Sequence, residues 1–239
     1  MALLEGRKIT KSFGGVQALH NVDFDVAPGT IVGLIGPNGA GKTTLFNAVA
    51  GAFKPTSGQV VFDGSDITGL PANVICRRGM ARTFQVTRPF AAMTCLENVM
   101  VAAINRYPEK PRSFIEGLAL EKLALVGLAD MERFEARHLN VVQKKRLEMA
   151  RALATGPKLL MLDEVLGGLN TQEINQAVAF IRRLRDELGL TVLWIEHVMG
   201  AIMPAAERVI VLDQGQVLMV GPPNKVVKDA RVIQAYLGE

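Results

Sequence analysis

The sequence predicts an α/β fold built on a parallel sheet, with a mostly helical subdomain inserted near its middle. Three observations lead to this prediction. The run 'TIVGLI' at 30–35 is apolar throughout, which is typical of a strand covered on both faces. Apolar residues recur at helical spacing from about Thr94 to Thr155. From 158 onward, strand-like and helix-like segments alternate, and this alternation is typical of a right-handed parallel sheet.

The expected elements follow in order along the chain. The first sixty residues contain the strand candidates 'GRKITKSF', 'VDFDV' and 'TIVGLI', and 'SGQVVFDG' follows them. Between the last two lies the predicted helix 'KTTLFNAVAGAF'. The helical subdomain contains 'LENVMVAAI', 'LALEKLALVGLA' and 'QKKRLEMARALA'. After it come the strands 'KLLMLDE', 'TVLWIEH', 'RVIVLD' and 'QVLMVG', with the helix 'QEINQAVAFIRRLRDELG' and a short helix near 'GAIMPAAE'. We expect one domain over residues 1–239, with the helical subdomain at about 94–155.

Composition narrows the class of protein. Hydrophobic residues make up 49% of the 239 residues and charged residues 21%, which is close to the average for soluble globular chains. No apolar run approaches the length of a membrane span, and the N-terminus lacks a signal-peptide pattern, so we expect the chain to stay in the compartment where it is made. Cys76 and Cys95 fit neither a disulfide framework nor a zinc spacing. The net charge of +4 is spread along the chain, which argues against nucleic acid as a partner.

A phosphate-binding loop is the strongest motif in the chain. The pattern G-x-x-x-x-G-K-[ST] lies between the apolar strand and the helix, which is the context the motif requires. Its glycines allow a sharp turn in which backbone N–H groups point at one concavity, and the start of the helix adds positive potential. A polyphosphate can bind there, with the lysine on the outer phosphates and the first threonine on magnesium. The motif comprises Gly36, Pro37, Asn38, Gly39, Ala40, Gly41, Lys42, Thr43 and Thr44.

Two acids supply the second half of such a site. The apolar residues Leu159–Leu162 run directly into Asp163 and Glu164, at the end of a strand where ligands bind in parallel sheets. Asp163 is predicted to hold magnesium through water. Glu164 is predicted to polarise the water that attacks the terminal phosphate.

With these motifs, the chain resembles the nucleotide-binding subunits of ABC transporters over nearly its whole length. 'GPNGAGKTT' is similar to their Walker A motif and 'LLMLDE' to their Walker B motif. The resemblance implies a P-loop NTPase fold with an N-terminal antiparallel β subdomain, and ATP and Mg²⁺ as cofactors. It also implies that Phe13 in 'KSFGG' stacks on adenine, although stacking alone does not separate ATP from GTP.

Further positions match the family's catalytic elements. Gln85 in 'RTFQ' matches the Q-loop glutamine, which contacts magnesium and the attacking water and moves with the membrane subunit. His197 in 'WIEH' matches the switch histidine, which contacts the terminal phosphate, and 'GGLN' at Gly167–Asn170 resembles the D-loop. The resemblance thus implies the catalytic residues Glu164, His197 and Gln85 and the metal-binding residues Thr43, Gln85 and Asp163.

This chain departs from the family pattern at the signature motif LSGGQ. The matching stretch is 'LNVVQ', in which Asn140 replaces serine and Val141 and Val142 replace the two glycines. Asn140 is a good N-cap and Gln143 can complete a capping box, so both are retained as nucleotide-binding positions. Two β-branched side chains stand where the nucleotide of a partner chain approaches. Either hydrolysis at that composite site is slow, or the change is a tolerated subfamily variant. Val165, in place of proline, is a milder departure.

Within the family, 'FGGVQAL', 'GMARTFQ', 'RPF', 'LENV' and 'RVIQAYLGE' resemble the ATPases of branched-chain amino acid importers. The resemblance implies as partners two integral membrane permease subunits, a second ABC ATPase chain that is a paralogue or an identical copy, and indirectly a substrate-binding protein. 'QVTRPFAAMTCLENV' matches the surface that receives the permease. The implied location is peripheral, on the cytoplasmic face of the inner membrane.

Other readings remain open at this point. Related ATPases serve urea, short-amide or lipopolysaccharide transport, and the residues do not name a cargo. A soluble ABC ATPase of DNA repair or translation usually carries a coiled-coil insertion or tandem domains, and this sequence has neither. A regulatory subunit that binds ATP with weak hydrolysis is favoured by 'LNVVQ' and disfavoured by Glu164 and His197.

Overall fold

Two sheets form the framework of the computed structural model, which describes residues 1–237. The first is antiparallel, with strand order β2-β1-β4-β5. Its strands are β1 (Leu4–Phe13), β2 (Val16–Val26), β4 (Ser57–Phe62) and β5 (Ser65–Asp66). This sheet agrees with the antiparallel β subdomain implied by the family resemblance.

The second sheet has six strands in the order β10-β9-β3-β8-β7-β6. Five of them, from β9 to β6, run parallel. The strands are β3 (Ile31–Ile35), β6 (Met80–Arg82), β7 (Leu159–Asp163), β8 (Thr191–Ile195), β9 (Arg208–Asp213) and β10 (Gln216–Gly221). The register aligns Leu34 with Ile195 and Ile195 with Asp163, so β3, β8 and β7 end at the same level.

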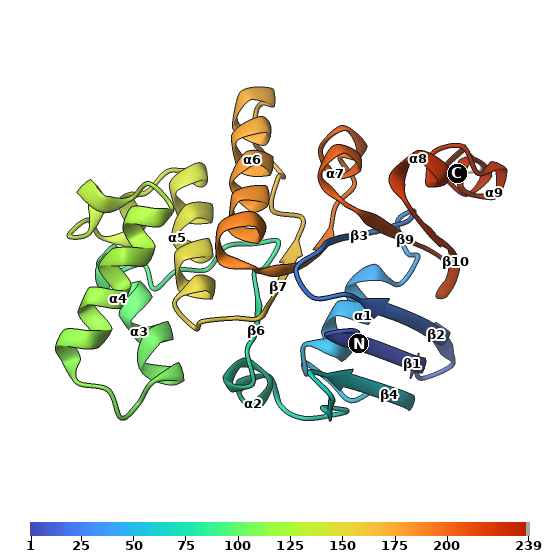
Figure 1. Ribbon diagram of the computed structural model, residues 1–239, viewed down its shortest axis with the longest axis horizontal. Coiled ribbons are helices and arrows are strands. Elements are labelled where there is room, and N and C mark those ends of the chain that lie inside the picture. Colours follow the sequence, from blue (N-terminus) through green and yellow to red (C-terminus); the bar gives the residue numbers. More distant parts are fainter. Residues whose placement is uncertain (238–239) are drawn as a thin grey trace.

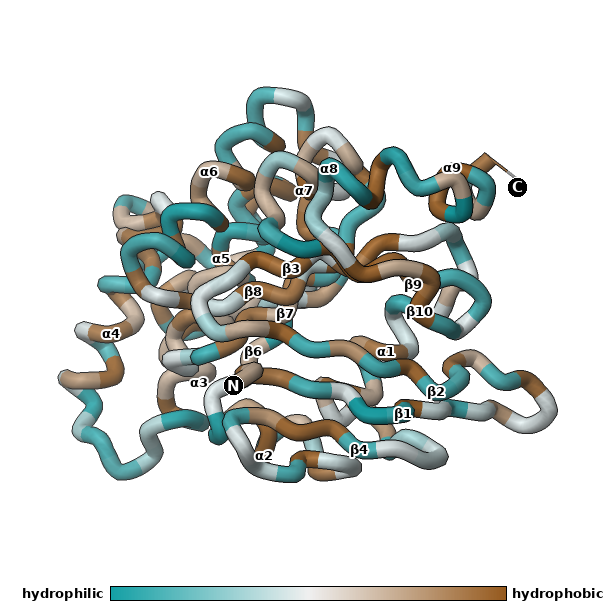
Figure 2. Tube along the Cα trace, turned by 45° about the vertical axis from the view of Figure 1, so that its right-hand side comes forward, coloured by the Kyte–Doolittle hydropathy of each residue, from teal (hydrophilic) through white to brown (hydrophobic). Residues whose placement is uncertain are grey.

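Helices cover both faces of the six-stranded sheet. Helix α1 (Lys42–Val49) lies between the two sheets, where Leu45, Phe46 and Val49 are buried in one core. Helices α6 (Thr171–Leu188) and α7 (Met199–Ala205) cover the opposite face in a second core. Alternate residues of the central strands enter the two cores, as the apolar sequence of these strands predicts. Figure 2 shows the apolar strands enclosed between more polar outer elements.

Three helices form a separate group beside the sheet: α3 (Cys95–Arg106), α4 (Arg112–Leu125) and α5 (Val141–Leu153) (Figure 1). They lie in the stretch where the sequence predicts helices. Two 3₁₀ helices, Ala129–Met131 and Ala136–His138, connect α4 to α5. The remaining helices are α2 (Ala72–Arg77), α8 (Pro223–Val226) and α9 (Ala230–Leu237). None of the helices described has the length and apolar character that a bilayer span requires.

The expectation of a parallel arrangement was wrong for 'QVLMVG'. This segment is β10, which pairs antiparallel with β9. Only Gln214 and Gly215 connect the two strands, and both have positive φ, at 44° and 76°. A two-residue turn of this kind makes a hairpin, whereas a parallel connection needs a long crossover.

Two smaller findings complete the fold. Strand β6 is only three residues long and was not predicted, because so short a segment carries no periodicity. The sequence match 'RVIQAYLGE' ends in Gly238 and Glu239, which lie outside the described residues.

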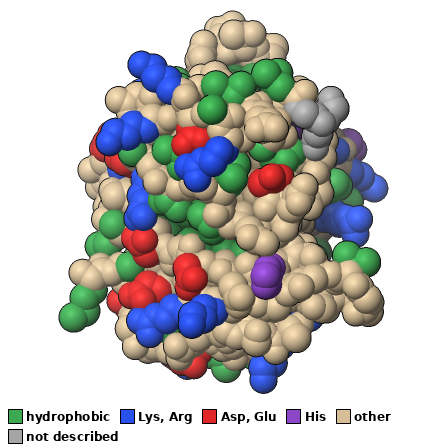
Figure 3. All heavy atoms as spheres, turned by 90° about the vertical axis from the view of Figure 1, so that its right-hand side faces the viewer, with side chains coloured by type: hydrophobic (Ala, Val, Ile, Leu, Met, Phe, Trp, Pro, Cys, Tyr) green, Lys and Arg blue, Asp and Glu red, His purple; other side chains and the backbone are tan. Residues whose placement is uncertain are grey.

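On the face shown in Figure 3, Lys and Arg side chains lie among Asp and Glu side chains.

Candidate functional site

The parallel strands bring the predicted residues to one edge of the sheet. Strands β3, β6, β7 and β8 end at this edge, and each is followed by a segment that carries candidate site residues. The phosphate loop follows β3 and Gln85 lies just beyond β6. Asp163 ends β7, with Glu164 next to it, and His197 lies two residues beyond β8. The carboxyl edge of a parallel sheet is where ligands of α/β folds bind.

The phosphate loop depends on glycine at two positions. Gly36 has φ of 152°, and a Cβ there would lie 2.1 Å from the carbonyl oxygen of Leu212. Gly41 has φ of 99°, and a Cβ there would lie 2.8 Å from the carbonyl oxygen of Ala18. Backbone atoms cannot move aside as a flexible side chain can. The loop can therefore adopt this shape only with glycine at both positions.

Lys42 and the start of α1 make the loop positively charged. The N-cap is Gly41, which has no side chain to cap the helix, so the first N–H groups of α1 are available to an anion. Lys42 is 8% exposed, and its Nζ donates to the carbonyl oxygens of Gly36 at 2.6 Å and Pro37 at 2.8 Å. These contacts hold the ammonium group over the loop, where a phosphate binds.

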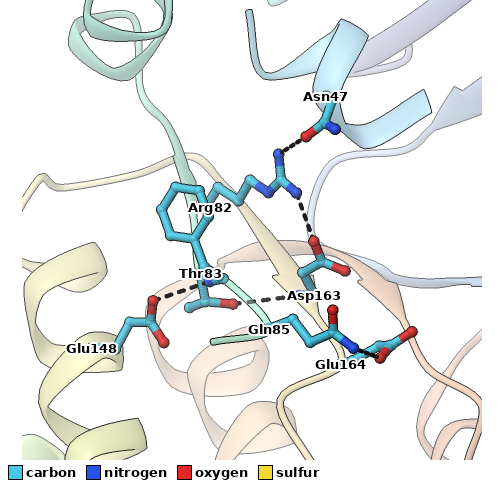
Figure 4. A network of polar contacts seen from close by, with 8 residues as sticks. Asn47, Arg82, Thr83, Gln85, Glu148, Asp163 and Glu164 are labelled. Atoms are coloured by element: carbon cyan, nitrogen blue, oxygen red, sulfur yellow. Dashed lines mark hydrogen bonds and ion pairs between the residues drawn. The ribbon is translucent and has the colours of Figure 1, made fainter. Parts of the chain in front are cut away.

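Asp163 is held by an arginine that the sequence analysis did not single out. Arg82 Nη2 lies 2.6 Å from Asp163 Oδ2, and Arg82 Nη1 donates to Asn47 Oδ1 at 2.6 Å (Figure 4). Asp163 is buried and Arg82 is largely shielded from solvent, with 6% and 11% side-chain exposure. Removing one partner of such a pair leaves an uncompensated charge and typically costs about 3–5 kcal/mol.

Glu164 lies at the centre of the polar groups at this edge. Gln85 Nε2 donates to Glu164 Oε2 at 2.5 Å, and His197 Nδ1 is 3.8 Å from Glu164 Oε1. Glu164 also has φ of 47°, in the left-handed region that non-glycine residues rarely adopt, and its N–H donates to the carbonyl oxygen of Ile195. Strain of this kind is typical of functional positions that the surrounding structure holds in place.

Two further side chains fix the segment that follows Glu164. Lys145 on α5 donates from Nζ to the carbonyl oxygen of Val165 at 2.7 Å. Glu196 is 1% exposed, and its carboxylate accepts the N–H of Leu166 at 2.9 Å. Burial raises the pKa of Glu196 and lowers the pKa of Lys145. The segment that directly follows Glu164 is thus held both from α5 and from the residue that follows β8.

Glu148 connects α5 to the segment that carries Gln85. Its Oε1 accepts the backbone N–H of Phe84 at 3.0 Å (Figure 4). Burial raises the pKa of Glu148 to about 7, against the opposing effects of the Phe84 hydrogen bond and of Arg151 and Lys145. Glu148 was another residue that the sequence analysis did not single out.

The oxygen donors at this edge fit a magnesium ion. Thr43, Gln85 and Asp163 line one cleft of about 710 Å³ between the sheet and the helices. They offer a hydroxyl, an amide and a carboxylate oxygen, the type of ligand that Mg²⁺ prefers. Mg²⁺ is usually bound by one or two carboxylates together with substrate phosphates. The phosphate loop lies next to this donor set, which satisfies that requirement.

The predicted adenine-stacking residue is accessible. Phe13 is 49% exposed and packs edge-to-face on Phe53, with ring centroids 5.3 Å apart. Lys11 lies over both rings, at 4.9 Å and 4.7 Å from their centroids. Phe53 and Lys11 were not singled out from the sequence.

The signature region forms the predicted capping box. Asn140 Oδ1 accepts the N–H of Gln143 at 2.9 Å, and Gln143 Oε1 accepts the N–H of Asn140 at 2.9 Å. The two valines differ in their surroundings: Val141 is 59% exposed, whereas Val142 is partly buried in a cavity against α6. The D-loop candidate ends at Asn170, which forms a second capping box with Glu173.

A family model for ABC transporters matches residues 19–167. The chain belongs to the ABC transporter family. This ABC ATPase is 40% identical to the high-affinity branched-chain amino acid transport ATP-binding protein BraF of Pseudomonas aeruginosa, over 99% of the chain and 98% of the relative. It is 39% identical, with the same coverage, to the corresponding protein LivG of Escherichia coli K12.

Solved structures agree with the family assignment. A nucleotide-free ATP-binding cassette from an ABC transporter superposes with a TM-score of 0.91 and 30% identity, over 100% of both chains. A dimeric cassette bound to ADP and Pi in a post-hydrolysis state superposes with a TM-score of 0.83 and 26% identity, over 92% of this chain and 98% of that one. The P-loop ABC fold and the assignment as an ATP-hydrolysing transporter subunit are therefore confirmed.

Four of the missed residues of this ABC ATPase share one property. Arg82, Glu148, Lys145 and Glu196 act through partners that are distant in the chain. Arg82 and Asp163, for example, are 81 positions apart. A short motif cannot reveal such pairs. The only sequence signal for Arg82 was its place three residues before Gln85.

Proposed function

We propose that this ABC ATPase powers the import of branched-chain amino acids, or of related amino acids or amides, through two integral membrane permease subunits. It would sit peripherally on the cytoplasmic face of the inner membrane, with a substrate-binding protein supplying the cargo. The sequence identity of 40% to BraF and 39% to LivG, over 99% of the chain, supports this assignment. Residues 1–239 would act as one domain, with a helical subdomain at about 94–155.

The observation that carries the ATPase mechanism is the convergence of Asp163, Glu164, Gln85 and His197 beside the phosphate loop. Lys42 and the start of α1 bind the phosphates. Thr43, Gln85 and Asp163 would hold Mg²⁺, which would supply positive charge to neutralise the phosphate oxygens. Phe13 stacks on the base. The other phosphate-contacting positions are Gly36, Pro37, Asn38, Gly39, Ala40, Gly41 and Thr44.

Glu164 acts as the general base. Its carboxylate accepts a proton from the attacking water, while the Gln85 amide and the His197 imidazole, both within reach of it, orient that water and the terminal phosphate. A positioned base of this type contributes about 10²–10⁴-fold to the rate. Asn140 and Gln143 at the start of α5 complete the site of a second ATPase chain, identical or paralogous, as the dimeric relative suggests.

Reconstitution with the permeases tests the transport assignment. In proteoliposomes that contain the permease subunits, the wild-type chain and the binding protein, ATP is expected to drive uptake of labelled leucine. The Glu164→Gln variant should assemble equally well and transport nothing. Uptake of urea or a short amide, but not of leucine, would show that the cargo is not a branched-chain amino acid. A chain that does not associate with the permeases would contradict the proposal.

A regulatory subunit with weak hydrolysis is the second candidate. It is favoured by Val141, which is 59% exposed at the start of α5, where the family has glycine. In this case ATP binds but turnover stays low even in the assembled complex. Turnover measured with and without the permeases separates the two candidates.

A further inference from the structure

Arg82 joins three parts of the site. It ends β6, and its guanidinium donates to Asp163 at the end of β7 and to Asn47 on α1, at 2.6 Å in each case. The same group lies over two aromatic rings, 5.7 Å from the centroid of Phe46 and 5.2 Å from that of Phe84. These contacts fix a positive charge directly beside the metal-binding acid.

The position of this charge has an electrostatic consequence. Arg82 occupies one carboxylate oxygen of Asp163, Oδ2, so a cation held through this acid must bind on the side of Oδ1. Both side chains are largely shielded from solvent, with 11% and 6% exposure, and in such an environment like charges repel more strongly than in water. Arg82 therefore weakens the attraction of Asp163 for a divalent cation.

Phe84 connects this pair to the surface. It is 57% exposed and lines the same cleft as Thr43 and Asp163. Its ring contacts the Arg82 guanidinium, and its backbone N–H is held by Glu148 of α5. Gln85 follows it in the chain. A partner that displaces Phe84 must therefore disturb both Arg82 and the segment that carries Gln85.

We propose that Arg82 sets the divalent-cation affinity of this ATPase by competing with the metal for Asp163, and that Phe84 stabilises the competing position. The inference rests on the proposed role of Asp163 in holding Mg²⁺.

The test measures metal dependence of nucleotide binding without turnover. A fluorescent ADP analogue is bound to the purified full-length chain while Mg²⁺ is titrated, and the half-saturating Mg²⁺ concentration is determined. Arg82→Met removes the charge but keeps an unbranched side chain that packs on Phe46 and Phe84. It is expected to lower the half-saturating concentration by about tenfold. Arg82→Lys, which keeps the charge, should stay near the wild-type value.

Two further variants keep the result interpretable. Phe84→Leu changes an exposed side chain and should shift the Mg²⁺ requirement in the same direction as Arg82→Met, by a smaller factor. Arg106→Met, at the last residue of α3, removes another arginine from a ring contact, in this case with Tyr107, and should leave the Mg²⁺ requirement unchanged. Thermal unfolding with and without Mg²⁺ and ADP gives a second readout, because a purely structural role lowers all melting temperatures equally. Arg82→Met should instead gain more from Mg²⁺ and ADP than the wild type does.

The outcomes separate this inference from the proposed function. Nucleotide binding by the wild type that does not depend on Mg²⁺ would contradict the metal role of Asp163. A wild type that depends on Mg²⁺, together with an Arg82→Met variant that needs the same or more Mg²⁺, would overturn only the role of Arg82. If Arg82→Met does not fold, an unchanged requirement in Phe84→Leu overturns the coupling to Phe84.

Discussion

Partly or fully buried ionisable side chains lie beside the segments that carry Gln85 and Glu164. Burial raises the pKa of Glu148 and of Glu196, and lowers the pKa of Lys145 and of Arg151. Each shift disfavours the charged form of the side chain. Each of these side chains therefore depends on hydrogen bonds and opposite charges from its neighbours to remain charged. At the scale of single residues, the site is therefore a connected polar network rather than a set of independent catalytic groups.

Glu148 gives this network a measurable pH dependence. Its pKa is about 7 in the folded chain against an ordinary value of 4.5, so the folded chain binds more protons than the unfolded chain between these values. Stability from this group is therefore fully present below about pH 4.5 and is lost as pH rises through about pH 7. Allowing for its partial exposure, we expect a loss of about 2 kcal/mol between about pH 5 and pH 8, relative to Glu148→Gln.

Urea unfolding of both proteins across this pH range measures the difference. Glu148→Gln retains a carbonyl oxygen that can accept the N–H of Phe84, so the hydrogen bond is kept while the titration is removed. Glu187→Gln, at an exposed position of α6, serves as the matched control and should follow the wild type. Parallel pH profiles of Glu148→Gln and the wild type would show that Glu148 does not titrate in this range.

The site residues that could be predicted from sequence differ from those that were missed. The first group is marked by the local sequence, whereas the second is marked only by contacts with distant residues. The phosphate loop, Asp163 and Glu164 lie at the ends of apolar strands, so local sequence predicts both their identity and their place. Glu148 looks like a solvated position on a polar helix until the fold brings Phe84 to it, and the two are 64 residues apart. Long-range partners of this kind depend on the fold and not on local spacing.

Helix α5 shows how one element serves several parts of the site. Its capping box satisfies two N-terminal N–H groups, an arrangement whose loss typically costs about 1 kcal/mol. Lys145 and Glu148 then reach Val165 and Phe84, so the helix that begins at the signature also supports the catalytic segments. Successive helical side chains point about 100° apart, which explains why Val141 is exposed while Val142 faces α6.

Substitution at the two valines separates their roles. Val141→Gly removes the exposed side chain from the face that a partner nucleotide approaches, and we expect ATP turnover to rise by about tenfold if this side chain obstructs the site. Val142→Gly removes a partly buried side chain and should instead lower stability by about 1 kcal/mol without raising turnover. Steady-state hydrolysis and urea unfolding of both variants measure these effects. Equal turnover in Val141→Gly and the wild type favours the tolerated-variant interpretation.

The parallel core of the six-stranded sheet was predicted from the sequence, but the antiparallel β9–β10 pair was not. The alternation of strands and helices predicts the parallel core, because each crossover needs a helix between two strands. The pair β9–β10 breaks this pattern through the tight turn at Gln214 and Gly215, whose sequence was not recognised as a hairpin. The hairpin lies at one margin of the sheet. This error therefore did not affect the prediction that the site lies at the carboxyl ends of the parallel strands.

The whole molecule consists of a sheet core and a helical group joined by two connections. One runs from β6 to α3 and carries Gln85, and the other runs from α5 to β7 and leads to Asp163. Movement of the helical group relative to the core must therefore act on both segments. In the proposed dimer, α5 of one chain approaches the phosphate loop of the other, so this movement would open or close the composite site.

ATP hydrolysis by the purified chain, at increasing protein concentration and with Glu164→Gln alongside, tests this account most directly. We predict turnover that rises faster than linearly with protein concentration, because two chains complete each site. In Glu164→Gln, turnover should fall by about 10²-fold or more while ATP binding is retained. Turnover by Glu164→Gln that equals the wild type would contradict the account, because the sheet edge at Asp163 and Glu164 would then not be where ATP is hydrolysed.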